Sequence, residues 1–158
     1  MFHVVLYRPE IPPNTGNIMR LCANTDTALH LIHPLGFTLE DQLLRRAGLD
    51  YREWAAVIEH DTLDRFLTEA VPARLLAFTR NAGHVHTDPD YRAGDALVFG
   101  PESDGLPAEV LSRPEIDDRL RIPMVPRSRS LNLSNAVAIV LYEALRQNGF
   151  PGLLEDGR

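Results

Sequence analysis

Short apolar runs alternate with segments of helical character along this chain, and this alternation is what most limits its possible folds. The runs lie at residues 2–7, 28–33, 55–58, 74–79, 96–99 and 119–123. Between several of them, helices are expected at about 15–26, 40–48, 61–70, 106–112 and 134–147. Strands that alternate with helices favour an α/β domain with a mostly parallel sheet.

The length and composition fit one globular domain. A chain of 158 residues can bury one real core but is short for two. We expect a domain over 1–153 and a short polar tail over 154–158. The apolar start at 2–7 is too short for a signal sequence or a membrane span. Cys22 is the one cysteine, so an internal disulfide is excluded and a reducing cytoplasm fits best.

The basic residues are all arginine. The formal net charge of −6 argues mildly against a nucleic-acid partner. The 16 basic residues include no lysine, which excludes a Schiff-base lysine and a P-loop phosphate site. Arginine is, however, the better side chain for bidentate phosphate contacts and for stacking on bases.

Three segments rich in glycine and asparagine each join a probable strand end to a probable helix start. They are residues 14–20, 99–107 and 122–136. In open α/β domains this edge is where ligands bind. Small residues let the backbone approach a ligand, while helical N–H groups and amide side chains hydrogen-bond it. The three segments therefore predict a binding site.

Polar side chains in these segments suggest what the site binds. Asn17, Arg20 and Asn24 share one helix stripe and could recognise a phosphate or a ribose, although a capped surface helix is the alternative. Glu102, bracketed by glycines, could accept from ribose hydroxyls or hold an arginine; a plain turn is also possible. The third segment carries more polar groups than helix capping requires: Arg127, Arg129, Ser130, Asn132 and Ser134.

Other sites are not expected. The chain has no G-x-G-x-x-G sequence, which argues against a Rossmann dinucleotide site. His84 and His86 would share a strand face, but no further ligands join them, so we expect no metal. Cys22 fits a small core residue better than a nucleophile. The other histidines are expected at strand ends and on the surface: His3, His30, His33 and His60.

The last helix has an unusually wide apolar face. Its helical spacing groups Leu133, Val137, Val140, Leu141, Ala144 and Leu145, and Ala136 and Ile139 widen this face. Such a helix can lie deep in its own core or pack against a second partner, such as another subunit. The pattern leaves both alternatives open.

The three segments resemble the motifs of a known enzyme class. NTGNIMR, FGPESDGLP and IPMVPRSRSLNLSNAVAIVLYEAL resemble, in order, the three motifs of the SPOUT class of RNA methyltransferases. The sequence is more closely similar to the small bacterial tRNA (cytidine/uridine) 2′-O-methyltransferases that modify the wobble ribose of leucine tRNAs. VLYRPEIPPNTGNIMRLCANT and LRRAGLDYREW strengthen this resemblance, which covers residues 1–153.

The resemblance implies a fold, a cofactor and partners. It implies a C-terminal trefoil knot, which generic fold rules would argue against. It also implies S-adenosylmethionine as cofactor, tRNA as substrate and a homodimer as the working form. Alternatives are another tRNA or ribosomal RNA target, a non-catalytic RNA-binding module, and a small-molecule enzyme that uses the same loops.

The resemblance also implies roles for individual residues. The cofactor would contact Phe78, Gly100, Ile122, Ser130, Leu131 and Asn132. Arg20 would act on the ribose hydroxyl, and Glu102, Asn132 and Tyr142 would support it. Because arginine is a poor base, we expect Arg20 to bind a phosphate and stabilise the developing alkoxide. The candidates for RNA contacts are Asn17, Arg45, Arg46, Arg127 and Arg129.

Overall fold

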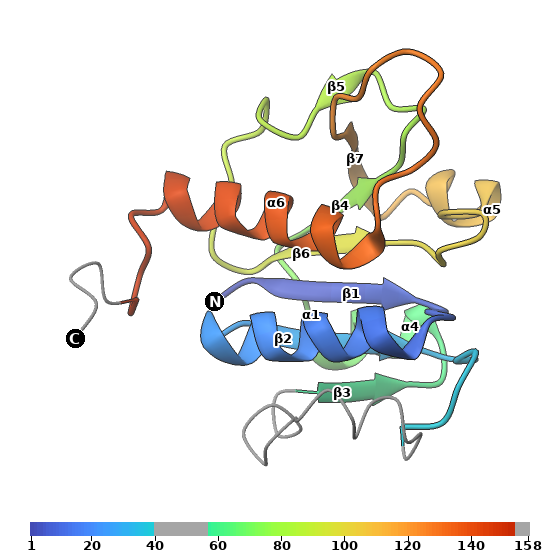
Figure 1. Ribbon diagram of the computed structural model, residues 1–158. Coiled ribbons are helices and arrows are strands. Elements are labelled where there is room, and N and C mark those ends of the chain that lie inside the picture. Colours follow the sequence, from blue (N-terminus) through green and yellow to red (C-terminus); the bar gives the residue numbers. More distant parts are fainter. Residues whose placement is uncertain (40–56, 154–158) are drawn as a thin grey trace.

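A wholly parallel sheet of seven strands forms the centre of the protein (Figure 1). The computed structural model describes residues 1–39 and 57–153. The strands are β1 (His3–Tyr7), β2 (Ala28–Ile32), β3 (Val57–His60), β4 (Arg74–Phe78), β5 (His84–Val85), β6 (Asp95–Phe99) and β7 (Ile116–Arg121). Their spatial order is β3-β2-β1-β6-β4-β7-β5. The predicted α/β class with a parallel sheet is therefore confirmed.

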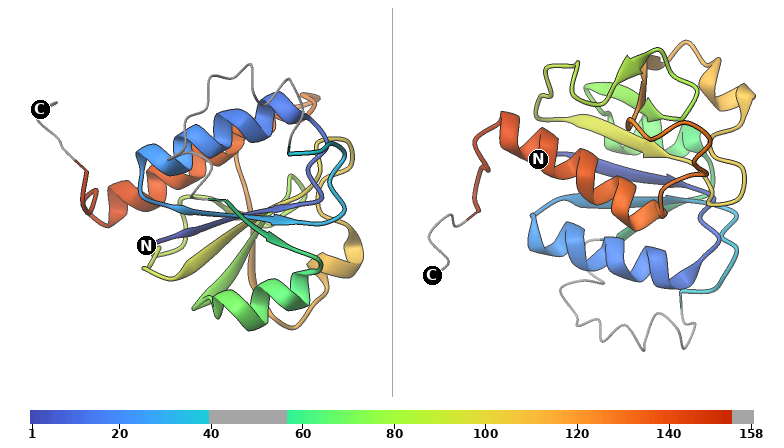
Figure 2. Two further views of the ribbon diagram at one scale, coloured as in Figure 1. Left: turned by 90° about the horizontal axis from the view of Figure 1, so that it is seen from below. Right: turned by 45° about the horizontal axis from the view of Figure 1, so that its top comes forward.

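Helices cover both faces of the sheet (Figure 2). The helices α1 (Pro12–Asn24) and α6 (Leu133–Gln147) lie side by side on one face. The other face carries α4 (Leu63–Ala70) and the short α5 (Ala108–Leu111). In the described chain, no helix is both long and apolar enough to cross a membrane.

The central strands are apolar because both of their faces are buried. In β1, Val4 and Leu6 pack under α1 and α6, while Val5 and Tyr7 point to the opposite cluster under α4. Strand side chains alternate between the faces, so a strand covered on both sides reads as a continuous apolar run. All five residues of β6 are buried for the same reason.

Element ends differ from the sequence-based expectations at several places. α1 begins at Pro12, before the expected residue 15, because prolines occupy its first positions, where a helix needs no N–H donor. The two-residue strand β5 is absent from the expected apolar runs, since it is too short to give a hydrophobic pattern, although a strand was considered at His84 and His86. The expected helix over 40–48 lies outside the described residues.

The prediction of a strand-end or surface position was wrong for His30, which lies inside β2 and is buried. His60 does end β3, as predicted, but it is buried as well. Their exposed fractions are 2% and 3%. His3 Nδ1 lies 3.0 Å from His30 Nε2, and His30 Nδ1 lies 2.9 Å from His60 Nε2. The row ends where His60 Nδ1 meets Glu69 Oε2 of α4 at 2.9 Å. Buried rings are tolerated because neighbouring strands place them in hydrogen-bonding distance of one another.

Burial and contacts describe two further candidates, Cys22 and His84. Cys22 is fully buried, as predicted for a core residue, and burial raises the pKa of its thiol to about 12. His84 pairs with Asp118 at 2.9 Å instead of sharing a site with His86. Within residues 1–39 and 57–153, no group of three side chains could hold a metal ion.

The wide apolar face of α6 divides between core and surface. The six residues predicted to form its main apolar face are all buried: Leu133, Val137, Val140, Leu141, Ala144 and Leu145. Ile139 and Tyr142 instead face outward, with 40% and 47% of their surface exposed. The helix thus packs in its own core and also presents apolar surface to solvent.

Candidate functional site

The three motif segments meet at the carboxyl ends of the parallel strands. The loop after β1 leads into α1, the loop after β6 leads toward α5, and the loop after β7 leads into α6. Because the strands are parallel, these loops lie at the same edge of the sheet, on the right of Figure 1. This is the edge at which open α/β sheets bind ligands.

Glu102 in the second segment binds the start of α1. Its carboxylate accepts from the backbone N–H of Glu10 (2.8 Å), the backbone N–H of Ile11 (3.2 Å) and the Asn14 Nδ2 amide (3.3 Å). A negative charge at a helix N-terminus is stabilised by the helix dipole. Within the structure Glu102 therefore holds a helix start, where we expected ribose hydroxyls or an arginine as its partners.

Glu10 returns the contact from the other loop. Its carboxylate accepts from the Ser103 backbone N–H at 3.0 Å and from the Ser103 hydroxyl at 2.9 Å. Each of the two loops therefore supplies a carboxylate to the donors of the other. Sequence reasoning missed Glu10, because its partner lies 93 residues away in the chain.

Asn132 joins the third segment to the first. Its side-chain oxygen caps α6 by accepting from the N–H of Ser134 at 2.9 Å and of Asn135 at 3.4 Å. Its amide Nδ2 donates to Asn14 Oδ1 at 2.8 Å. Asn132 thus both caps α6 and contacts the first segment, and Asn14, which sequence reasoning did not single out, connects all three segments.

The polar stripe on α1 is exposed, as the spacing predicted. Asn17, Arg20 and Asn24 all lie on the outer surface of the helix. Arg20 follows Asn14 by six residues, which places it about 9 Å further along the helix axis. The stripe therefore runs away from the site along α1, on the same face of the sheet as α6 (Figure 2).

Tyr142 is not brought to the other supporting residues within this chain. It follows Asn132 by ten residues along α6, so about 15 Å of helix separates them. Its ring centroid lies 6.5 Å from that of Phe150, near the far end of the helix. Of the residues implied to support Arg20, the structure thus brings Glu102 and Asn132 together through Asn14 and leaves Tyr142 apart.

The residues implied to bind the cofactor lie along the same edge. Phe78 ends β4 and stacks on Phe99, with ring centroids 4.8 Å apart. Ile122 follows β7 and is half-buried, whereas Ser130 and Leu131 are exposed. Ile122 and Leu131 offer apolar surface beside a polar backbone, which suits a ligand that has both an aromatic base and an amino-acid part.

The loop before α6 makes few backbone–backbone hydrogen bonds within the part of the chain that the structure describes. Among the described residues, the loop over 123–131 makes one backbone–backbone hydrogen bond, from the Ser128 N–H to the Val125 carbonyl oxygen at 3.2 Å. The remaining N–H and C=O groups of this loop can therefore bind a ligand. Arg127 and Arg129 are exposed on the same loop, while Arg45 and Arg46 lie outside the described residues.

Gly100 has a structural reason to be glycine. A Cβ at this position would lie 2.1 Å from the Leu106 nitrogen and 2.2 Å from the Gly105 carbonyl carbon. No side chain fits there, so the second segment can fold back on itself only with glycine. Gly105 complements it with a φ of +72°, in the left-handed region.

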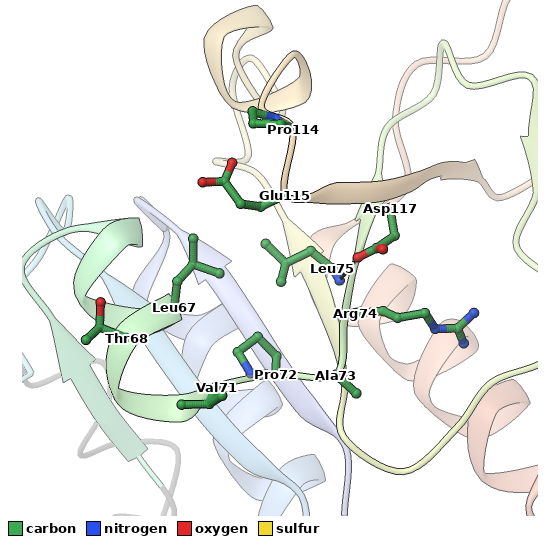
Figure 3. A pocket seen from close by; sticks show the side chains of 10 residues that line it. All are labelled: Leu67, Thr68, Val71, Pro72, Ala73, Arg74, Leu75, Pro114, Glu115 and Asp117. Atoms are coloured by element: carbon green, nitrogen blue, oxygen red, sulfur yellow. Dashed lines mark hydrogen bonds between the residues drawn. The ribbon is translucent and has the colours of Figure 1, made fainter.

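A shallow hollow of about 440 Å³ lies at the opposite edge of the sheet (Figure 3). It is lined by the end of α4, the start of β4 and residues 114–117. Leu67 and Leu75 line it, and none of the predicted site residues does. The hollow therefore does not belong to the site at the carboxyl edge.

Comparison with known sequences decides the family. The SpoU rRNA Methylase family matches residues 1–142. The chain belongs to this family. A tRNA (cytidine(34)-2′-O)-methyltransferase of Escherichia coli strain K12 is 55% identical over 152 residues, covering 96% of this chain and 97% of that protein. The resemblance found from the three motifs is thereby confirmed.

Solved structures agree with this assignment. One, concerned with the 2-OH methylation of C/U34 on tRNA, is 45% identical with a TM-score of 0.85, and the match covers 94% of this chain and 97% of that one. Another, an AdoMet-bound rRNA methyltransferase from Sinorhizobium meliloti, is 26% identical with a TM-score of 0.80. That match covers 92% of this chain and 56% of the other.

Proposed function

We propose that this protein transfers a methyl group from S-adenosylmethionine to the 2′-hydroxyl of the cytidine or uridine ribose at the tRNA wobble position, with leucine tRNAs as substrates. The observation that carries the proposal is the joining of all three motif segments at one edge by Glu102, Asn14 and Asn132. The near full-length similarity to a cytidine-34 2′-O-methyltransferase supports the target nucleotide.

The residues at this edge fit the cofactor. Within the described residues, the loop over 123–131 makes a single backbone–backbone hydrogen bond, so its other backbone groups can face a ligand, and Ile122 and Leu131 provide apolar surface. When bound, S-adenosylmethionine supplies an electrophilic methyl group. We assign its binding to Phe78, Gly100, Ile122 and the 130–132 segment, as the resemblance implies.

The protein must align the ribose hydroxyl and stabilise its oxygen as the proton leaves. Arginine stays protonated at neutral pH, so Arg20 serves as a donor to the developing alkoxide and to the adjacent phosphate. Its exposed position on α1 leaves it accessible to RNA. Asn17 on the same face, and Arg127 and Arg129 on the loop before α6, would contact the RNA backbone, as would Arg45 and Arg46.

We also propose that two copies form the working enzyme. Ile139 and Tyr142 expose apolar surface on α6, on the face of the sheet that carries Arg20. A second copy that covers this face would bury both side chains and could bring its own Tyr142 toward the site. The cytoplasm, where tRNA is modified, is the matching compartment.

The trefoil knot belongs to the same proposal. After β7 the chain returns across the sheet to place α6 beside α1. The helix α1 packs on β2, and three strands, β4, β6 and β1, lie between β7 and β2. The 122–132 segment therefore has to pass the loops that follow β4 and β6. Threading through one of these loops would give the knot that the resemblance implies.

Transfer of labelled methyl from S-adenosylmethionine to bulk bacterial tRNA, followed by nuclease digestion, tests the function. We expect label in a 2′-O-methylated C or U at the first anticodon position. Arg20→Ala should lose most turnover and keep cofactor binding. Label in ribosomal RNA instead, the substrate named for the SpoU rRNA Methylase family, would replace the proposed target. Unchanged turnover in Arg20→Ala would remove Arg20 from the mechanism.

A further inference from the structure

Asn14 stands where the three motif segments meet. It is the third residue of α1, and 6% of its surface is exposed. Its Nδ2 donates to Glu102 of the second segment at 3.3 Å, and its Oδ1 accepts from Asn132 of the third at 2.8 Å. The donor and the acceptor of this buried side-chain amide are therefore both hydrogen-bonded, each to a different segment.

The charge of Glu102 fixes the direction of every bond in this row. A carboxylate can only accept, so Asn14 must turn its NH₂ group toward Glu102 and its oxygen toward Asn132. Asn132 must then present its own NH₂ group to Asn14, which leaves its oxygen to face α6. There it accepts from the N–H groups of Ser134 and Asn135 and from the Ser134 hydroxyl.

We propose that Asn14 is a positioning residue that transmits the polarity set by Glu102 to Asn132, and so holds residues 130–132 in one orientation against α1. A flipped Asn14 would present oxygen to the carboxylate and NH₂ to NH₂, so both bonds would be lost together. The inference rests on the proposed function in one respect: residues 130–132 are taken to contact the cofactor.

Asn14→Asp tests this role because it keeps the shape of the side chain and replaces its donor by an acceptor. At pH 8 two carboxylates would face each other, which repels residue 14 from Glu102. At pH 5.5 a proton shared by the pair would restore a donor, because close like charges raise the pKa of one carboxyl group.

Two readouts follow the effect beyond residue 14. Hydrogen exchange at the Ser134 and Asn135 amides should be at least about tenfold faster in Asn14→Asp than in wild type at pH 8. The affinity for S-adenosylhomocysteine, measured by calorimetry, should fall at least about tenfold. At pH 5.5 the amide exchange rates and the S-adenosylhomocysteine affinity of Asn14→Asp, each divided by the wild-type value, should return toward one. Neither readout requires methyl transfer, so failure of the proposed reaction would leave this test intact.

The double variant Asn14→Asp/Glu102→Gln separates charge repulsion from a damaged fold. It leaves one carboxylate in the pair and so removes the repulsion. The amide introduced at position 102 can donate to the carboxylate introduced at position 14, at the cost of the bond that the same Glu102 oxygen accepts from the Ile11 N–H. We expect it to recover protection at Ser134 and Asn135 at pH 8, even if the single variant is unfolded there. Thr68→Asp, which adds the same charge on the opposite face of the sheet, is the control.

The proposal would be overturned if the variant-to-wild-type ratios of exchange rate and affinity were the same at pH 8 and pH 5.5. It would also be overturned if the Ser134 and Asn135 amides of Asn14→Asp exchanged as slowly as in wild type at pH 8.

Discussion

The imidazoles of His30 and His60 share a hydrogen bond of 2.9 Å between Nδ1 and Nε2 in the layer between the sheet and α4. Glu69 fixes its direction: the carboxylate binds Arg65 at 2.6 Å and accepts from His60 Nδ1. The His60 Nε2 is then an acceptor, so His30 donates from Nδ1, and His3 donates to His30 Nε2. A second proton on His30 would go to Nε2, which would then no longer accept from His3 Nδ1.

This row predicts loss of stability in mild acid. Burial, followed by the charges of His3 and His60, lowers the pKa of His30 from 6.5 to about 3. Above pH 6.5 both folded and unfolded chains hold His30 neutral, and its contribution to stability is fully present. Between pH 6.5 and about 3 the unfolded chain binds a proton that the folded chain does not, so stability falls as pH falls.

Urea unfolding from pH 8 to 5 measures this effect. One such group gives a slope that approaches about 1.4 kcal/mol per pH unit below pH 6. His30→Leu should flatten the slope by that contribution. It should also lose about 1–3 kcal/mol at pH 8, because His60 Nε2 and His3 Nδ1 lose their partner. An undiminished slope in His30→Leu would show that other groups bind the proton.

Sequence reasoning could predict what depends on local pattern. β1, β4, β6 and α6 are continuous apolar runs or clear helical repeats, and their existence was predicted. The histidine row and the Asn14 contacts depend on strand register and on chain topology. Asn14 and Glu102 are 88 residues apart, and nothing in either segment shows that they touch. The burial of His30 likewise requires a partner on each neighbouring strand.

Substitution of Gly100, in the second segment, should destabilise the fold, and the same substitution at Gly83 is its control. Gly100→Ala places a Cβ 2.1 Å from the Leu106 nitrogen, which is backbone and cannot turn aside. We expect a loss of at least about 3 kcal/mol in the free energy of unfolding, together with lost cofactor affinity. Gly83→Ala adds its Cβ with no atom within 4 Å and should change stability by less than about 1 kcal/mol. Equal urea midpoints for the two variants would contradict the loop geometry.

Exposed arginines on the loop before α6 predict a salt-dependent RNA affinity. If Arg127 and Arg129 each neutralise a phosphate, log affinity for tRNA should fall steeply with log salt despite the formal charge of −6. Alanine at both positions should reduce that slope by roughly one per arginine. Filter binding over a range of salt concentrations measures it. Arg92→Ala is the control, since Arg92 is exposed at the opposite edge of the sheet.

The outward face of α6 predicts how the proposed homodimer can be broken without unfolding the chain. Ile139 is 40% exposed, so Ile139→Asp costs the isolated chain little. In a dimer that covers this face, the same carboxylate would be buried without a partner. We expect dimer affinity to fall at least about tenfold by sedimentation velocity, while the far-ultraviolet spectrum stays unchanged.

Val71→Asp is the matched control for this dimer test. Val71 is 76% exposed beyond the end of α4, on the other face of the sheet, and its φ of +44° suits aspartate better than valine. It should leave the dimer intact. If Ile139→Asp sediments as wild type does, the partner covers another surface. If both variants dissociate, added charge and not the α6 face would be responsible.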